Sequence, residues 1–384
     1  MSGAARGEAL GVGIIGCGVV SEAYLSLAPL FAGIEVRAVA DIDPAAAGAR
    51  GEAHGVPALG VDEMLARDDI DIGVNLTVPA AHAAVSRRVL EAGKHVYSEK
   101  PFVLSAAEGR ELAALARARV LRVGSAPDTF LGGTPQLARE LVDGGRIGRV
   151  TSATAHVMSH GMEHWHPNPD FFYKGGAGPV LDVGPYYLTA LVQLLGPVER
   201  VAAMSATPRA ERLIACGPRA GETVAVEAPT TLHAVLEFVD GAVVTLGASW
   251  DVRDHAHPPL QLYGERGTLS LPDPNFFGGE LLVSEGEDEA ARESLEAGDH
   301  PFAVPNRESS RGPVANYRTA GLAEMANAIR EGRPHRCSLE LALHVVETMT
   351  AVLDSAERRG FVEIESRCER PAPLDADAAR ALLA

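Results

Sequence analysis

A carboxylate and an ammonium group stand side by side in the stretch GKHVYSEKPFVLS, Gly93 to Ser105. Glu99 and Lys100 follow a short apolar run, and Pro101 restricts the backbone directly behind them. Adjacent opposite charges are commonly an exposed pair that contributes little to stability. These two come directly after a strand pattern, and in a parallel sheet ligands gather at the carboxyl ends of the strands. The stretch therefore predicts a binding or catalytic role for Glu99 and Lys100.

A second segment with side chains that could take part in a reaction is GGAGPVLDVGPYYLTAL, which contains Asp182 and Tyr186. Pro185 suits the first position of a helix, so Tyr186 is expected in the opening turn. A free phenol has a pKa of ~10, but a nearby lysine ammonium and a helix N-terminus both favour the phenolate. We therefore expect Lys100 and Tyr186 to share a proton, while Asp182 orients Lys100 or binds a substrate hydroxyl. The alternative is that Tyr186 and Tyr187 only pack the start of a helix.

A glycine turn precedes both segments, in GVGIIGCGVVSEAYL. Gly16 permits a tight turn after a strand, and Gly18 lets a pyrophosphate approach the backbone at the positive end of the next helix. The third position of the glycine pattern is Ser21, and Asp41 follows twenty residues later at the end of the second strand pattern. A carboxylate at this spacing binds the adenosine ribose and repels a 2′-phosphate, which predicts NAD and makes NADP less favoured. Asp43 either shares this role or begins the next turn.

Further cofactor contacts are expected where the strand pattern that ends in NLTVPAAH and the strand pattern before Glu99 reach the same edge of the sheet. The residues expected at the cofactor are Gly16, Gly18, Val19, Val20, Asp41, Thr77, Pro79, His82, Glu99 and Lys100.

The stretch HGMEHWHPNPDFFY contains His160, His164 and His166 together with Glu163. Imidazole and carboxylate groups suit zinc, but no H-E-x-x-H order occurs and the prolines indicate a loop. We expect a carbohydrate-binding loop and no metal, with Trp165 stacking on a sugar. The residues expected at the substrate are Lys100, Trp165, His166, Asn168, Tyr173, Asp182 and Tyr186. His255 and His257 belong either to this pocket or to a surface loop.

Two kinds of element must position these residues. The first third of the chain alternates apolar strands with helices, which predicts an α/β unit with a parallel sheet. From about Gly133 the strands alternate in polarity and are joined by tight turns at Asp240-Gly241 and Glu265-Arg266. We predict a Rossmann domain at residues 1–130 and, at residues 131–384, an α+β domain built on a large open, mainly antiparallel sheet. The segment from Pro272 to Pro313 is predicted to be a long surface loop with an acidic part.

Composition limits the partners. The chain of 384 residues has 34 basic and 51 acidic side chains, a formal net charge of −17. This charge argues against nucleic acid or an anionic membrane surface as partner. The 4 cysteines form no C-x-x-C pair, which fits a reduced, cytoplasmic setting. No apolar run reaches the ~18 residues of a membrane-spanning helix.

With these residues in view, the chain resembles the Gfo/Idh/MocA oxidoreductases, which act on sugars and cyclitols. The resemblance rests on GIIGCGVVSEAYL, AVADIDP, NLTVPAAHAAV, EAGKHVYSEKP, GGAGPVLDVGPYYLTAL and AEMANAIREGRPHRCSLELALHVVETM. It implies that Lys100 contacts the reacting hydroxyl or carbonyl group and the nicotinamide region, that a cis peptide bond precedes Pro101, and that the open sheet pairs subunits into a homodimer or homotetramer. Tyr186 stands where the family commonly has an acid/base histidine.

The resulting prediction is NAD-dependent hydride transfer at a secondary alcohol or ketone of a sugar, glycoside or cyclitol. Two alternatives remain: an enzyme that uses NAD transiently to cleave glycosides, and a regulator that binds NAD without turnover. The combination of Lys100 with Asp182 argues against the regulator, because a sensor needs no proton relay.

Overall fold

A six-stranded parallel sheet forms the N-terminal unit of the computed structural model, which describes residues 9–286, 292–309 and 312–384. Its strand order, β3-β2-β1-β4-β5-β6, is that of a dinucleotide-binding fold. The strands are β1 (Leu10–Ile15), β2 (Ile34–Ala40), β3 (Ala58–Leu59), β4 (Ile72–Asn75), β5 (His95–Ser98) and β6 (Val123–Ser125). The connecting helices are α1 (Val19–Leu27), α2 (Pro44–His54), α3 (Val61–Leu65), α4 (His82–Glu91) and α5 (Ala106–Arg119). The predicted Rossmann fold is confirmed.

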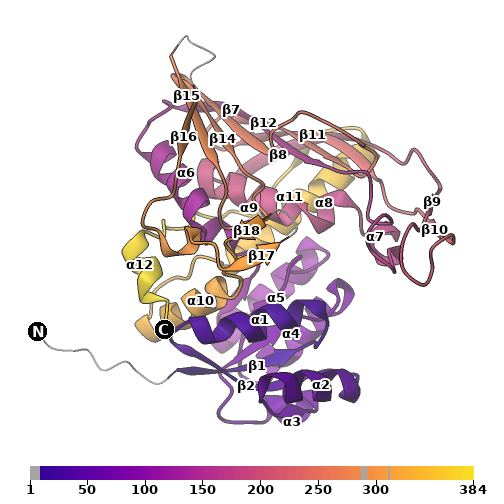
Figure 1. Ribbon diagram of the computed structural model, residues 1–384, viewed down its shortest axis with the longest axis vertical. Helices are drawn as coiled ribbons and strands as arrows, with labels where there is room; N and C mark the ends of the chain where they lie inside the picture. Colours follow the sequence, from indigo (N-terminus) through magenta and orange to yellow (C-terminus); the bar gives the residue numbers. More distant parts are fainter. Residues whose placement is uncertain (1–8, 287–291, 310–311) are drawn as a thin grey trace, which may run out of the picture.

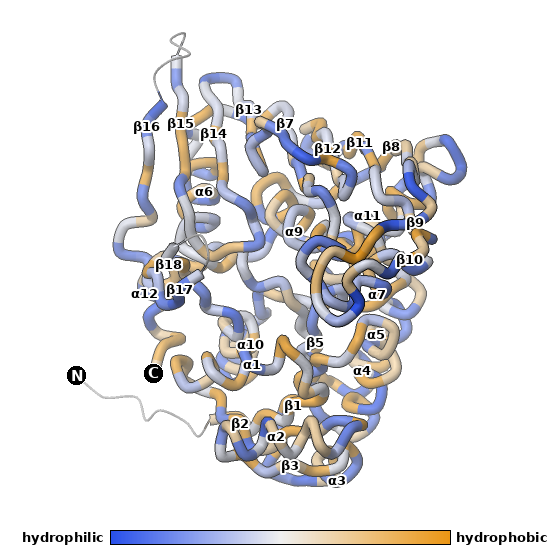
Figure 2. Tube along the Cα trace, turned by 45° about the vertical axis from the view of Figure 1, so that its right-hand side comes forward, coloured by the Kyte–Doolittle hydropathy of each residue, from blue (hydrophilic) through white to orange (hydrophobic). Residues whose placement is uncertain are grey.

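The strands are apolar because helices cover both faces of the sheet. All residues of β4 are buried, and β1 is apolar along its length (Figure 2). In Figure 1 this unit forms the lower part of the molecule, and a second, larger sheet lies across the top.

The second sheet has nine strands in the order β16-β15-β14-β13-β7-β12-β11-β8-β19. Only β7 and β12 pair in parallel, which confirms the mainly antiparallel prediction. The strands are β7 (Val150–Met158), β8 (Val198–Ala206), β11 (Thr231–Phe238), β12 (Val243–Ser249), β13 (Leu260–Gly264), β14 (Gly267–Leu271), β15 (Leu281–Glu285), β16 (Arg292–Leu295) and β19 (Val362–Glu363). Helices α6 (Gly133–Asp143), α9 (Gly184–Leu195) and α11 (Leu339–Arg358) pack beneath it (Figure 1).

The prediction of a long surface loop from Pro272 to Pro313 is wrong. Strands β15 and β16 extend the large sheet, and β17 (Arg307–Ser309) pairs with β18 (Gly312–Val314). Leu281 and Val283 are buried on β15, but each apolar run is too short to stand out between glycine- and glutamate-rich flanks. Residues 287–291, in the acidic part, and residues 310–311 lie outside the described residues.

The end of the chain returns to the Rossmann unit. Helix α10 (Ala320–Glu331) packs beside β6, and α11 contacts both α5 and β6. Isolated bridges join Gly124 to Ser338 and Phe31 to Leu383. Packing therefore crosses the sequence boundary near residue 130, and loops of the C-terminal segment come to lie beside the strand ends of the N-terminal sheet. No helix in the described part of the chain is long and apolar enough to cross a membrane.

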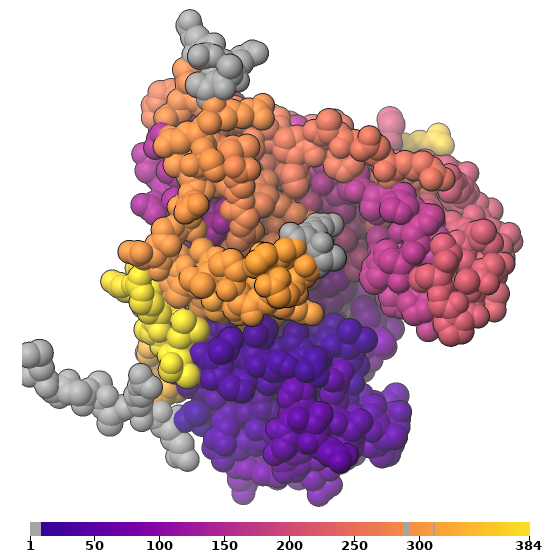
Figure 3. All heavy atoms as spheres, viewed as in Figure 1, coloured from indigo at the N-terminus to yellow at the C-terminus, as the bar shows by residue number. Residues whose placement is uncertain are grey.

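A small arm projects from the large sheet. It contains α7 (Asp170–Tyr173), β9 (Glu211–Leu213) and β10 (Thr223–Ala225). Its own apolar cluster is separate from the main core, and Figure 3 shows the arm standing out from the rest of the molecule. The cluster consists of Met162, Phe172, Tyr173, Ile214, Val224 and Trp250.

Candidate active site

The glycine turn between β1 and α1 has the shape required to receive an anion. Gly16 has φ +102°, and a Cβ there would lie 2.6 Å from the Leu76 carbonyl group, so only glycine fits. A Cβ on Gly18 would meet no atom within 4 Å. Helix α1 has no side-chain cap, and Val19 and Val20 are exposed, so the first backbone N–H groups of the helix face open space. The turn therefore fits the pyrophosphate of a dinucleotide.

The Ser21 side chain is buried, and its hydroxyl donates a hydrogen bond to the Gly18 carbonyl oxygen at 2.6 Å. A small residue thus takes the place of the third glycine without lengthening the turn.

Asp41 lies against the glycine turn. Its Oδ2 accepts a hydrogen bond from the Cys17 N–H at 2.7 Å, and its Oδ1 accepts one from the Asp43 N–H at 2.9 Å. Asp43 instead caps α2, because its carboxylate accepts a hydrogen bond from the Ala45 N–H. Asp43 therefore begins the next helix, as one of the two alternatives expected, and its share in binding the ribose stays a prediction. Asp41 remains the carboxylate predicted to bind the ribose.

Buried hydrogen bonds hold the ends of β4 and β5 together. The Thr77 hydroxyl donates to Asn75 Oδ1 at 2.7 Å. Pro79 begins a short 3-10 helix, Pro79–Ala81. The His82 ring is buried, with its nitrogens 2.7 Å from the Pro101 carbonyl oxygen and 3.0 Å from that of Thr77. His82 therefore ties the two strand ends together, and the structure does not support its predicted direct contact with the cofactor.

Glu99 and Lys100 are held in different directions. The Glu99 carboxylate accepts hydrogen bonds from the Tyr24 hydroxyl, at 3.1 Å, and from the Lys100 N–H, at 2.8 Å. Lys100 Nζ donates to the carbonyl oxygen of Asp182 at 2.8 Å and to its Oδ1 at 2.9 Å. The peptide bond between Lys100 and Pro101 is cis, as predicted.

The Lys100 ammonium is stabilised by its surroundings. Burial opposes the charged form, but the charge and the hydrogen bond of the Asp182 carboxylate act against burial, and the pKa of Lys100 is raised above its usual value. The side chains of Lys100 and Asp182 are 19% and 26% exposed, so the pair is accessible from solvent. At neutral pH this site presents an ammonium group that can donate hydrogen bonds.

Tyr186 lies in the first turn of α9, as predicted, with its ring centroid 5.5 Å from Lys100 Nζ. Its hydroxyl accepts a hydrogen bond from Arg318 Nη2 at 3.3 Å. Burial raises the pKa of Tyr186, and the opposing effects of Arg318 and Lys100 do not overcome it. The expected lowering of the Tyr186 pKa is not found, because desolvation exceeds the attraction of the cations, and Tyr186 is a neutral phenol at neutral pH. That Lys100 and Tyr186 share a proton stays a prediction.

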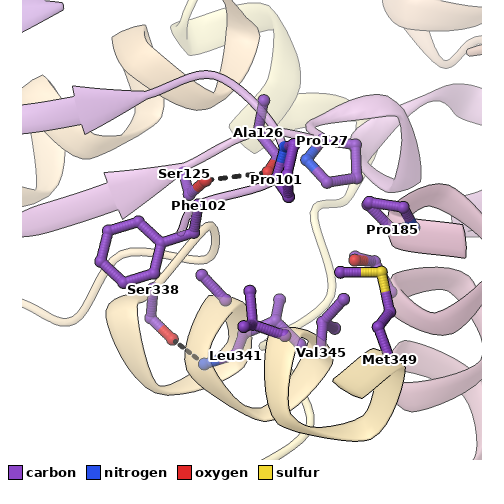
Figure 4. Close-up of a pocket in the computed structure, with 13 residues that line it drawn as sticks. Pro101, Phe102, Ser125, Ala126, Pro127, Pro185, Ser338, Leu341, Val345 and Met349 are labelled. Atoms are coloured by element: carbon purple, nitrogen blue, oxygen red, sulfur yellow. Dashed lines mark hydrogen bonds between the residues drawn. The ribbon is translucent and has the colours of Figure 1, made fainter. Parts of the chain in front are cut away.

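Apolar packing fixes the spacing between Lys100 and Tyr186. Pro101, directly after Lys100, and Pro185, directly before Tyr186, line the same small cavity (Figure 4). Side chains of α11, including Leu341 and Met349, close the opposite wall. Lys100 and Tyr186 thus belong to backbone segments that pack against the same apolar side chains.

Four polar residues of the site escaped the sequence analysis: Tyr24, Asp128, Asn275 and Arg318. The Arg318 Nη2 that contacts Tyr186 also donates to Asn275 Oδ1 at 2.8 Å. The buried Asp128 carboxylate accepts backbone hydrogen bonds at the start of α10. Tyr24 lies in the glycine-turn segment GIIGCGVVSEAYL, but at no position of the glycine pattern, and the other three belong to no motif quoted above. Arg318 and Asn275 reach the site through the packing of the C-terminal segments against the Rossmann unit.

The arm carries the predicted sugar-binding loop. Trp165 is 61% exposed and packs edge-on against His166, at 5.3 Å between ring centroids. Among the described residues, no hydrogen bond or ring contact joins Trp165, His166 or Asn168 to Lys100, Asp182 or Tyr186, so their contact with substrate remains a prediction.

Tyr173 has a different environment. Its side chain is fully buried in the core of the arm, where its hydroxyl donates to the Glu163 carboxylate and accepts a hydrogen bond from the Met162 N–H. The structure does not support a substrate contact for Tyr173, since its ring is buried among apolar side chains and its hydroxyl already has two hydrogen-bond partners.

The histidines form two groups. His160 and His164 contact each other on the arm, at 4.3 Å between ring centroids. His255 and His257 lie in an exposed loop between β12 and β13, where His257 stacks on His156 of β7 at 4.1 Å between ring centroids, so the surface-loop alternative holds. Within the described ranges, no group of three or more His, Cys, Asp or Glu side chains is arranged to hold a metal ion.

The site combines three features: an open helix N-terminus at a glycine turn, an acid after β2 and a lysine after β5. Together they define an oxidoreductase site of the dinucleotide-dependent class. Residues 10–126 match the oxidoreductase family with an NAD-binding Rossmann fold, and residues 136–270 match the Gfo/Idh/MocA C-terminal domain. The chain belongs to the Gfo/Idh/MocA family of oxidoreductases.

Relatives agree with this assignment. The chain is 30% identical over 267 residues to a dTDP-3,4-didehydro-2,6-dideoxy-alpha-D-glucose 3-reductase of Saccharopolyspora spinosa, covering 67% of this chain and 73% of the relative. It is 27% identical over 336 residues to D-xylose 1-dehydrogenase (NADP(+)) 2 of Haloferax volcanii, covering 86% and 92%. A levoglucosan dehydrogenase solved with NADH and L-sorbose shares the fold, with a TM-score of 0.78, 20% identity and coverage of 94% of this chain and 100% of that one.

Proposed function

We propose that this enzyme transfers a hydride at a ketone or secondary alcohol of a sugar, glycoside or cyclitol with NAD as cofactor, and that the site favours ketone reduction. The observation that carries the proposal is the convergence of two protonated groups. The Lys100 ammonium lies 5.5 Å from the ring of Tyr186, a neutral phenol. A ketone oxygen gains negative charge during reduction and needs such donors. The two relatives named above act on sugars, which supports this substrate class.

When a dinucleotide is bound, its reduced nicotinamide would supply the hydride. Gly16 and Gly18 would hold the pyrophosphate, and Asp41 would hold the adenosine ribose. Lys100 Nζ donates a hydrogen bond to the substrate oxygen and stabilises its developing charge. Tyr186 Oη transfers its proton to that oxygen, which completes the hydroxyl group, and the phenolate then regains a proton from solvent. Asp182 keeps the Lys100 side chain directed at the site through the two hydrogen bonds described above.

The test measures the change in reduced-nicotinamide absorbance with panels of keto-sugars, in the reducing direction, and of sugars, glycosides and cyclitols, in the oxidising direction. We expect Lys100→Met to bind NAD normally and to lose roughly a hundredfold or more in kcat. Lys94→Met is the matched control, because Lys94 lies just before β5 and its Nζ, among the described residues, donates a hydrogen bond only to the Arg67 carbonyl oxygen. Native turnover in Lys100→Met would refute the proposal.

Tyr186→Phe tests the proton donor separately. We expect a loss of roughly a hundredfold in kcat, the usual scale for general acid catalysis. Tyr187→Phe removes a neighbouring hydroxyl that bonds to Asp273, and should retain activity. Equal losses in both variants would show that the effect comes from packing of α9.

A further inference from the structure

Arg318 approaches the Tyr186 hydroxyl from the loop before α10. A guanidinium group has donors and no acceptor, so in the 3.3 Å contact the phenol oxygen must accept. The hydroxyl proton of Tyr186 is therefore directed away from Arg318. We propose that Arg318 is a positioning residue for catalysis, which orients the Tyr186 proton toward the substrate oxygen and stabilises the phenolate left after proton transfer. This inference rests on the proposed function, because it assumes that Tyr186 is the proton donor.

Among the described residues, no carboxylate neutralises the charge of Arg318 by direct contact. In the part of the chain that the structure describes, Arg318 forms no ion pair with a carboxylate, and the hydrogen bonds of its guanidinium group go to the neutral groups of Tyr186 and Asn275. The acids that act on it, Glu99 and Asp128, do so from longer range. A carboxylate in contact with Arg318 would cancel most of the electric field of the guanidinium group at the phenol oxygen. Without such a carboxylate, that field can stabilise a negative charge that develops on the phenol oxygen.

The backbone on both sides of Arg318 is fixed. Thr319 is buried and has φ +101°, an outlier for a β-branched residue that surrounding structure must enforce. The Asp128 carboxylate enforces it by accepting the N–H groups of Thr319 and Gly321, both at 3.0 Å. On the other side, Asn316 exchanges two hydrogen bonds with Asn306, at 2.7 and 2.8 Å. This anchoring holds the arginine against the phenol.

The charged groups around Tyr186 set the sign of the expected pH effect. Lys100 and Arg318 lower the pKa of the phenol, and Glu99 and Asp182 raise it, in addition to burial. Removal of Arg318 therefore raises the pKa further. Since the protonated phenol is the active acid in ketone reduction, the alkaline limit of activity should move to higher pH. The maximal rate should fall, because the phenolate is less stabilised.

The experiment compares Arg318→Met and Arg318→Lys with the wild-type enzyme. Arg358→Met is the control, since Arg358 is exposed at the end of α11 and its ion pair within the described ranges is with Asp354. We expect Arg318→Met to lower kcat roughly tenfold or more, to leave the NAD dissociation constant unchanged and to shift the alkaline limit upward. Arg318→Lys keeps the charge and should retain an alkaline limit near that of the wild type. An unchanged limit in Arg318→Met would overturn the proposal.

A double variant distinguishes this inference from the proposed function. In a Tyr186→Phe background, Arg318→Met should cause no further loss in kcat, because both residues act through one hydroxyl. Additive losses would overturn the positioning role and leave the proton donor intact. Full activity of Tyr186→Phe alone would instead refute Tyr186 as the donor.

A spectroscopic titration adds a readout independent of turnover. The tyrosinate absorbance is followed as the pH is raised. The ionisation step that is absent from Tyr186→Phe belongs to Tyr186, and this step should occur at higher pH in Arg318→Met than in the wild-type enzyme.

Discussion

Asp41→Asn tests the cofactor site most directly. Each oxygen of the Asp41 carboxylate accepts one backbone N–H, from Cys17 and from Asp43. An asparagine side chain has only one oxygen, so either orientation of its amide places an NH₂ group against a backbone N–H. The substitution therefore breaks one hydrogen bond of the glycine turn and removes the negative charge predicted to bind the ribose.

The magnitude follows from the predicted hydrogen bonds between the Asp41 carboxylate and the ribose. Hydrogen bonds to a charged group contribute about 1.5–3 kcal/mol each. Loss of about 2 kcal/mol of binding free energy corresponds to roughly a 30-fold higher dissociation constant for NAD. The same change removes the repulsion of a 2′-phosphate, so the preference for NAD over NADP should decrease.

Calorimetric titration of both dinucleotides into the wild-type, Asp41→Asn and Asp43→Asn proteins measures this effect. Asp43→Asn is the matched control, because asparagine caps a helix as well as aspartate does and the Ala45 N–H keeps its acceptor. An NAD dissociation constant within about threefold of the wild-type value in Asp41→Asn would refute the role of the carboxylate. So would an equal loss in Asp43→Asn.

Two further predictions concern stability. Burial lowers the pKa of His344 from 6.5 to about 4, so between these pH values the unfolded chain binds a proton that the folded chain does not. The free energy of unfolding should therefore fall by about 3 kcal/mol as the pH drops through that window, and urea titrations of His344→Gln should show a flatter pH dependence than the wild type. Thr319→Gly should raise the free energy of unfolding by about 1 kcal/mol, since it relieves a positive φ and removes a buried hydroxyl that has no partner among the described residues. A decrease measured by urea unfolding would show that packing of the threonine side chain outweighs the strain.

The glycine turn and the acid that lies against it were predictable because their signals are local. The strand, the glycine turn, the helix and the acid after the next strand follow one another within a short stretch, and each residue type has a direct backbone consequence. Gly16 illustrates this: its position after an apolar strand predicts a tight turn, and the positive φ confirms it. The hairpins at Asp240-Gly241 and Glu265-Arg266 were predictable for the same reason.

The proton chemistry was not predictable in this way. The sequence places Tyr186 at a helix start near a lysine, which favours a phenolate, but it does not give the degree of burial that raises the pKa instead. Tyr173 follows the same pattern, since an aromatic residue in a polar loop proved to be the buried core of the arm. Burial depends on what the rest of the chain packs against a residue, and local sequence does not contain that information.

By itself, the sequence determined the Rossmann topology, the mainly antiparallel second sheet, the glycine turn with Asp41 after β2, and Lys100 after β5. These follow from short-range patterns of hydrophobicity, glycine, proline and charge. Only the tertiary structure decided that Asp182 binds Lys100, that Tyr186 is a neutral phenol, and that Arg318 contacts its hydroxyl. Those contacts join segments far apart in the chain, and their energies depend on desolvation, which arises only when the two units pack together.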